Sequence, residues 1–154
     1  MIELAAVATV ADVVPLVGEN REIVRRGLKK IANTSLVGLR ALIQSATREG
    51  SPITSDTIGF GIGPRINAAG RLDDAMLAVK LLITSDSEEA KTLSRELNDL
   101  NAKRQEISQR IFEEAEAMLT ASGKVPTWGI VLDQRRLASW CHWYCGVPTD
   151  RKIP

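Results

Sequence analysis

The chain has 154 residues, of which 44% are hydrophobic and 25% are charged, an ordinary composition for one globular domain. Its formal net charge of +1 excludes attraction of nucleic acid by overall charge, so any such contact requires a local patch. The sequence contains no apolar run long enough to span a membrane and no signal-peptide pattern, so we expect a cytoplasmic protein.

Thiol and imidazole side chains are missing from residues 1–139, because both cysteines and the only histidine lie between residues 140 and 145. A metal site in the first part of the chain could therefore use only carboxylates and water, which suits Mg²⁺ or Mn²⁺ and excludes structural zinc. The crowded run from Cys141 to Cys145 does not supply four zinc ligands either.

Residues 2–14 are almost uninterrupted Ala, Val, Leu and Ile and end at Pro15, a pattern that fits a buried strand as well as a buried helix. Asp12 stands out in this run, because a carboxylate in so apolar a context must be paired, cap a turn or bind a cation. Helices are predicted over residues 20–32 and 36–46, and a short one after Thr54 or Ser55. The basic residues of the helix predicted over residues 20–32 could contact a nucleic-acid backbone or form a solvated face.

The most unusual stretch is residues 59–74, which contains four of the eleven glycines together with Arg65, Asn67, Arg71 and two aspartates. Glycines allow a close approach to a ligand or a positive φ, and the arginine fork matches phosphate oxygens. The structural alternative is a helix connector whose arginines pair with Asp73 and Asp74.

A helix is predicted over residues 75–83, followed by a cap cluster at 84–87 and a helix that continues to Ala121. Its apolar positions, which Arg104 interrupts, fit a connector along the same protein better than a dimeric coiled coil. Residues 128–133 read as a strand.

Residues 63–74, Gly-Pro-Arg-Ile-Asn-Ala-Ala-Gly-Arg-Leu-Asp-Asp, resemble the signature of the RecJ family, single-strand-specific DNA exonucleases of the DHH phosphoesterase superfamily. Residues 8–16, with Gly-Glu-Asn-Arg at 18–21, resemble the segment of that family's fourth metal-binding motif. The similarity covers roughly residues 2–134. The other three motifs, including the Asp-His-His triplet, are missing and are expected upstream of Met1.

The resemblance implies an α/β parent protein, of which this chain is a mainly α part. Residues 1–85 would complete a DHH catalytic domain, 86–122 would form a long connecting helix, and 125–134 would begin a DHHA1 domain. The implied activity is 5′ to 3′ hydrolysis of single-stranded DNA in repair and recombination with two Mn²⁺ or Mg²⁺ ions. Asp12 would be a catalytic metal ligand, while Arg65, Asn67 and Arg71 would bind phosphates, Arg71 with a catalytic role. The chain alone is expected to be a monomer without activity.

Two other functions are compatible with the residues. One is a DHH phosphodiesterase that acts on oligoribonucleotides or cyclic dinucleotides, and the other is a helical adaptor in which Arg65 and Arg71 are structural. From Arg135 the composition changes and the resemblance stops. Codons for residues 137–149, read one nucleotide later, permit Trp-His-x-Gly-Val-Ile-Gly-Ile-Val-Ala-Ser, similar to the nucleic-acid-binding motif of the family's second domain. We therefore predict a frameshift near residues 134–137 and a tail, 135–154, that is not a selected sequence.

Overall fold

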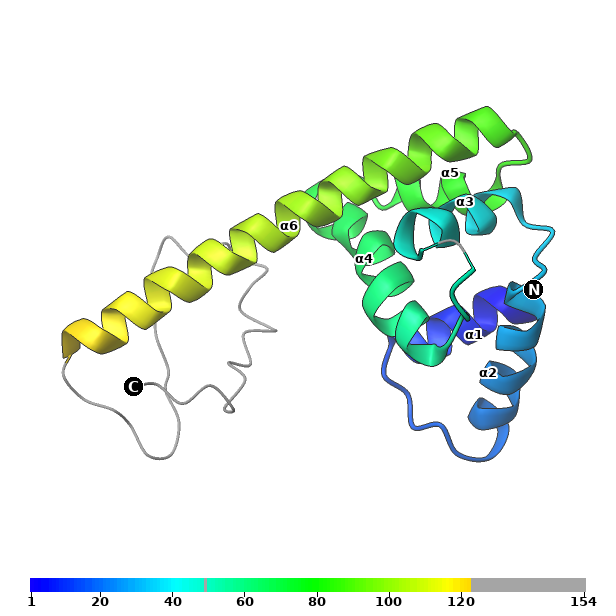
Figure 1. The fold of residues 1–154 in the computed structure, drawn as a ribbon, viewed down its shortest axis with the longest axis horizontal. Coiled ribbons are helices and arrows are strands. Elements are labelled where there is room, and N and C mark those ends of the chain that lie inside the picture. Colours follow the sequence, from blue (N-terminus) through cyan, green and yellow to red (C-terminus); the bar gives the residue numbers. More distant parts are fainter. Residues whose placement is uncertain (49, 123–154) are drawn as a thin grey trace. The chain divides into compact units, whose positions relative to one another are not determined.

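The computed structural model describes residues 1–48 and 50–122, and all regular structure there is helical (Figure 1). The strand predicted at 128–133 and the tail from 135 lie outside these residues. The predicted helices and the mainly α character of this part are confirmed. The elements are α1 (Ile2–Ala11), α2 (Gly18–Ile31), α3 (Val37–Ala46), the π-helix η1 (Thr57–Ile62), α4 (Gly63–Leu72), α5 (Met76–Ile83) and α6 (Ser87–Ser122).

The first two helices pack closely because a glycine lies at their contact. A Cβ added to Gly27 of α2 would lie 2.2 Å from the Cβ of Ala6 and 3.0 Å from the carbonyl oxygen of Ile2. Only glycine fits at this position. The apolar run at the start of the chain is therefore a helix packed on its neighbour, and not the strand that its composition also allowed.

The buried carboxylate of α1 is Glu3, whereas Asp12 is exposed. Glu3 is 2% exposed; its Oε1 accepts a 3.1 Å hydrogen bond from the Thr34 hydroxyl, and its Oε2 lies 3.7 Å from Lys30 Nζ. Burial raises the pKa of Glu3, but the Thr34 hydrogen bond and the Lys30 charge outweigh it, so the net effect is a lowered pKa. This carboxylate ties the start of α1 to the end of α2.

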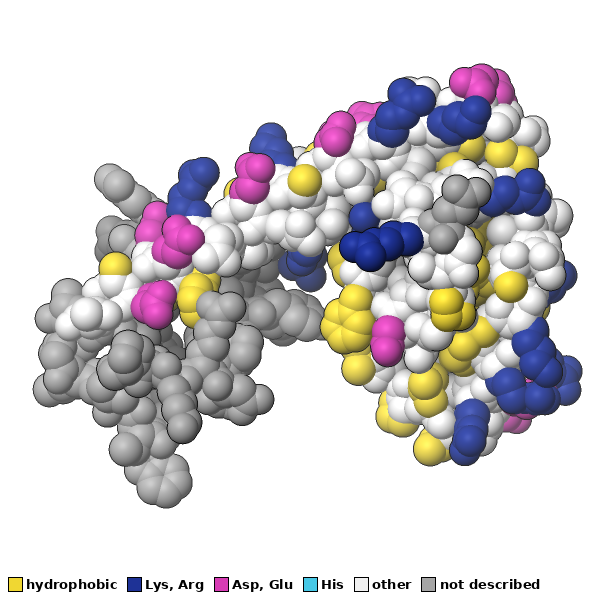
Figure 2. Space-filling view, in the orientation of Figure 1, with side chains coloured by type: hydrophobic (Ala, Val, Ile, Leu, Met, Phe, Trp, Pro, Cys, Tyr) yellow, Lys and Arg dark blue, Asp and Glu magenta, His cyan; other side chains and the backbone are white. Residues whose placement is uncertain are grey.

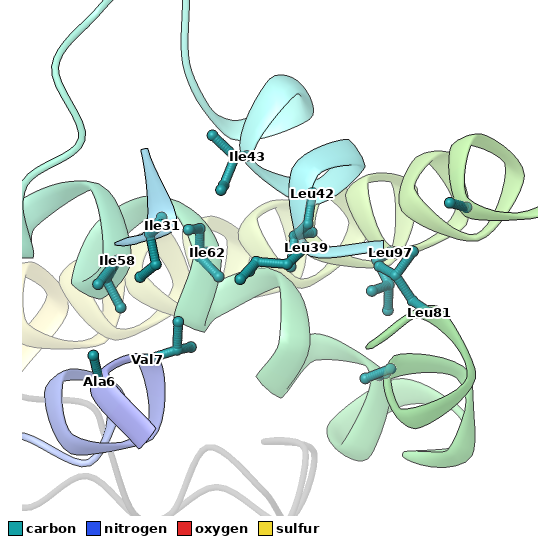
Figure 3. Packing of buried hydrophobic residues seen from close by; sticks show 13 residues of the cluster. Ala6, Val7, Ile31, Leu39, Leu42, Ile43, Ile58, Ile62, Leu81 and Leu97 are labelled. Carbon is teal, nitrogen blue, oxygen red and sulfur yellow. The ribbon is translucent and has the colours of Figure 1, made fainter. Parts of the chain in front are cut away.

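The core lies where α1, α2, α3, η1, α4, α5 and the first part of α6 meet (Figure 3). Each fully buried Leu or Ile side chain contributes about 1.5–3 kcal/mol relative to an exposed one. Ile58 and Ile62 place η1, the start of the glycine-rich stretch, in the middle of this core. The largest fully buried apolar side chains are Ile31, Leu39, Leu42, Ile58, Ile62, Leu81 and Leu97.

Helix α6 begins at the predicted cap cluster. The Asp86 Oδ1 accepts a 2.8 Å hydrogen bond from the Glu88 N–H, and the Thr84 hydroxyl oxygen accepts one of 3.2 Å from the Asp86 N–H. The apolar positions Leu93, Leu97 and Leu100 lie at the core, as predicted. The chain divides into two units, Met1–Ala102 and Lys103–Pro154, and α6 belongs to both. Of the helices described, none is long and apolar enough to cross a membrane.

Candidate functional site

Asp12 is the C-cap residue of α1, and its side chain is exposed. Two backbone hydrogen bonds close the helix end in a Schellman arrangement: Val13 N–H to Val10 O at 3.1 Å, and Val14 N–H to Thr9 O at 3.2 Å. The helix end thus presents the Asp12 carboxylate to solvent, where a cation could reach it.

Val13 occupies the left-handed position of this motif, with φ of 55°. Glycine is usual there because a β-branched side chain in the left-handed region is strained, at a cost of about 1–3 kcal/mol. The side chain is also 83% exposed, so burial does not offset the strain. Strained residues cluster at functional sites, and this one directly follows the predicted metal ligand.

The glycine-rich stretch is helical from η1 through α4, and its glycines do not use the positive φ that glycine allows. Among the described residues only Gly18 and Gly50 are glycines with positive φ, and neither belongs to this stretch. Pro64 has no N–H for a regular α-helical bond to Phe60, which accounts for the π-turn of η1 just before it.

The glycines of η1 and α4 instead allow close packing against other helices. A Cβ on Gly63 would lie 3.3 Å from the Cβ of Ala11, and one on Gly61 would lie 3.4 Å from the Cβ of Ala46. The first turn of α4 is therefore packed on the last turn of α1, next to Asp12. Arg71, eight residues after Gly63, lies about 12 Å further along the helix axis.

The three predicted phosphate-binding residues do not share one face of α4. Asn67 and Arg71 are four residues apart, which places them on the same face, with Asn67 exposed and Arg71 half-buried. Arg65 is two residues from Asn67, about 160° away around the helix. The structure thus brings Asn67 and Arg71 together and separates Arg65 from them.

The Arg65 guanidinium is half-buried and donates three hydrogen bonds within the protein. Nη1 donates to Gly61 O at 2.8 Å, Nη2 to Ser45 O at 3.2 Å, and Nε to Asn98 Oδ1 at 3.1 Å. Burial lowers the pKa of Arg65, because desolvation disfavours the charged form. The partners Ser45 and Asn98 lie 20 and 33 residues away in the chain. No local pattern in the sequence indicated them.

The residues present do not by themselves fit a two-metal centre. Across residues 1–48 and 50–122 there is no group of three or more His, Cys, Asp or Glu side chains that could hold a metal ion. Asp12 has the carboxylate chemistry that Mg²⁺ or Mn²⁺ requires, but one carboxylate is not a site. Any complete centre needs ligands that this part of the chain does not supply.

The basic side chains predicted on the second helix lie at the surface, and Lys and Arg gather over α2 in Figure 2. Hydrogen bonds from Arg25 and then Arg26 lower the pKa of Glu22 to about 2. Part of this positive charge is therefore balanced by Glu22 on the same helix face.

No protein-family model matches the chain. The chain does match curated relatives that are named single-stranded-DNA-specific exonuclease RecJ. The Bacillus subtilis protein is 39% identical over 80% of this chain, and the Thermus thermophilus protein is 46% identical over 71% of it. Each alignment covers 16% of the relative. The Haemophilus influenzae protein is 38% identical over 98% of this chain and 26% of its own length. That alignment thus includes most of residues 135–154, beyond the predicted end of the resemblance.

The solved structures give the same result. Crystal structures of RecJ from Thermus thermophilus in complex with Mn²⁺ and with Mg²⁺ match 73% of this chain with a TM-score of 0.68 and 44% identity. The matched part is 17% of the Mn²⁺-bound chain and 18% of the Mg²⁺-bound one. By sequence and by fold, the chain belongs to the RecJ family and spans about a fifth of the length of its first relatives.

Proposed function

We propose that this chain is part of an exonuclease that hydrolyses single-stranded DNA from its 5′ end, in repair and recombination, as a monomer in the cytoplasm. The names of the relatives support the substrate class, and their crystal structures with Mn²⁺ or Mg²⁺ support a metal-dependent reaction. The observation that carries the proposal is the exposed Asp12 at a strained helix end, packed beside the helix that presents Asn67 and Arg71.

Asp12 would supply one carboxylate ligand to a two-metal centre, whose other ligands lie outside the described residues. When bound, such ions activate water and stabilise the leaving oxygen. Val13 and Val17 follow Asp12 closely in the chain and are 83% and 69% exposed. Phe60 is 84% exposed and belongs to η1, where an added Cβ on the neighbouring Gly59 would lie 3.7 Å from Val10 of α1. Exposed apolar side chains of this kind fit a face that the rest of a longer enzyme covers. The boundaries of a DHH domain at 1–85, a connecting helix at 86–122 and a DHHA1 domain from 125 belong to the same proposal.

Asn67 and Arg71 would hold phosphates of the strand. They share one face of α4, and the arginine fork can bond two phosphate oxygens at once. Because Arg71 lies about 12 Å along the helix from the turn beside Asp12, it would hold the strand at a distance from the metals. The resemblance also implies a phosphate contact for Arg65, whose fork retains two N–H groups beyond those already bonded.

The test uses the full-length exonuclease that contains this segment, with end-labelled single-stranded DNA and Mn²⁺. Asp12→Asn should lower turnover about a hundredfold or more, because it removes a ligand charge. Asp99→Asn, an exposed carboxylate on α6, is the matched control and should change turnover less than twofold. Equal activity of the Asp12 variant and the control would refute the proposal. The 154-residue chain alone should bind Mn²⁺ no more strongly than its Asp12→Ala variant.

A further inference from the structure

Arg65 lies where three helical elements meet. Its guanidinium bonds to the Gly61 carbonyl in η1, to the Ser45 carbonyl in the last turn of α3, and to the Asn98 side chain of α6. Ser45 is one of the last α3 residues, whose carbonyls have no partner within the helix, and a cation near that end is favoured by the helix dipole. One side chain therefore joins α4 to two helices that are distant in sequence.

A second polar contact links the same two helices. Ser94 of α6 is 3% exposed, and its hydroxyl lies 3.1 Å from the Ser45 hydroxyl and 3.2 Å from the carbonyl oxygen of Ala41. Ser94 and Asn98 are four residues apart, so both face α3 and α4 from one side of α6. The contacts form a polar seam between α6, α3 and α4, at the edge of an otherwise apolar core.

We propose that Arg65 is a positioning residue and not a phosphate ligand: through Asn98, Ser45 and Gly61 it fixes the rotation of α4, so that the opposite face turns Asn67 and Arg71 toward the DNA strand. This inference rests on the proposed function for the role of those two residues. The bonds that Arg65 makes are independent of it.

The alternative role for Arg65 is to bind a phosphate of the strand. The three partners of Arg65 are neutral, so its charge could still attract a phosphate through the two remaining N–H groups. The two roles differ in what Asn98 does. If Arg65 is a positioning residue, its effect depends on Asn98. If it binds a phosphate, its loss changes the salt dependence of DNA binding by itself.

The first experiment is a double-mutant cycle on urea unfolding of the 154-residue chain, with Arg65→Ala, Asn98→Ala and the double variant. Each single change should raise the unfolding equilibrium constant about tenfold, and the double variant should fall at least about fivefold short of the product. Arg95→Ala, an exposed arginine on α6, should be additive with Asn98→Ala. Should Arg65→Ala fail to fold, Arg65→Lys replaces it in the cycle, because lysine cannot reach all three acceptors. Additivity of the Arg65 and Asn98 variants overturns the proposal.

The second experiment measures turnover and oligo-dT binding against salt concentration in the full-length exonuclease. Arg65→Ala and Asn98→Ala should lower kcat by a similar factor and change the slope of log K against log salt by a similar amount, because both act through the orientation of α4. Arg71→Ala should reduce that slope by about 0.7, the value for one single-strand phosphate. If Arg65→Ala reduced the slope while Asn98→Ala left it unchanged, Arg65 would be a phosphate ligand and the proposal would be wrong. If the full-length enzyme did not bind oligo-dT, the proposed function would be wrong. The unfolding cycle would still decide whether Arg65 acts through Asn98.

Discussion

Gly38 of α3 lies directly against the backbone of Leu81 in α5: a Cβ on Gly38 would lie 1.6 Å from the Leu81 carbonyl oxygen and 2.6 Å from its carbonyl carbon. Because the obstacle is backbone, it cannot move aside as a flexible side chain could. Gly38→Ala should therefore lower the free energy of unfolding by at least about 2 kcal/mol, the scale of overpacking in a core. Urea unfolding followed by circular dichroism measures this loss.

The control for that variant is Gly70→Ala in α4, where an added Cβ would meet only the Cβ of Ala75, at 3.8 Å. Alanine is the better helix former, so this change should stabilise the chain by up to about 1 kcal/mol. If both variants gave the same loss, the close approach of α3 and α5 would be wrong.

Val13→Gly should stabilise the chain although it removes an apolar side chain. The change relieves the strain of a β-branched residue at φ of 55°, and the greater freedom of glycine in the unfolded chain cancels part of the gain. The expected net gain is up to about 1 kcal/mol in the free energy of unfolding. Val14→Gly, at a neighbouring position without positive φ, should instead destabilise the chain. A loss for both variants would show that Val13 is not strained.

The buried Glu3 predicts a pH dependence of stability. Its pKa in the folded chain is lowered from 4.5, so its stabilising contribution is complete above about pH 4.5 and is lost as the pH falls toward the folded pKa. Thr34→Val removes the hydrogen bond to the carboxylate and should cost about 1–3 kcal/mol at pH 7.

The difference between wild type and Thr34→Val should narrow as the pH falls below 4.5, because the protonated carboxyl is less sensitive to the missing hydroxyl. Urea unfolding at a series of pH values tests this, with the exposed Thr92→Val as the control. A difference that stays constant over the whole acid series would mean that the Thr34 hydrogen bond does not stabilise the charged form of Glu3.

Local signals in the sequence predicted α2, α3, α5 and α6, left α1 open between helix and strand, and did not predict α4 or the contacts of the site. The caps at Asp86 and Thr84 act between neighbouring residues, so the start of α6 could be predicted. Thr34, which donates to Glu3, is 31 residues away from it, and Asn98, one of the partners of Arg65, is 33 residues away; such non-local contacts have no periodic pattern. The position of Asp12 at a helix end was only one of the alternatives that the sequence left open, because Val13 stands where glycine would have marked the end.

Substitutions of Arg71 distinguish a phosphate contact from a structural role for this side chain. In the full-length exonuclease, Arg71→Ala should lower turnover by about a hundredfold or more and leave the melting temperature within a few degrees. Arg71→Lys should restore little, because the ammonium is a point charge without the bidentate fork. Single-turnover cleavage and thermal melts of the same preparations give both quantities. A much lower melting temperature with unchanged activity per folded molecule would assign Arg71 to structure.

The tail, residues 135–154, provides a test that needs no activity. Its composition and the family motif in the shifted frame predict that a single-nucleotide change near residues 134–137 altered the reading frame. The alignment with the Haemophilus influenzae relative, which includes most of this tail, predicts the opposite, namely a continuous frame. Sequencing the locus decides between them directly.

A stability measurement tests whether residues 135–154 contribute to the folded protein. Residues that were never selected should not stabilise the helices, so a chain ending at Gln134 should unfold at the same urea concentration as the 154-residue chain. A selected tail that buries even one of Trp140, Trp143 or Tyr144 would contribute about 2 kcal/mol or more. Trp140→Ala and Trp143→Ala in the 154-residue chain separate the two cases, since a shifted tail predicts no loss for either. An uninterrupted frame together with a loss of that size on truncation would show that the tail belongs to the fold.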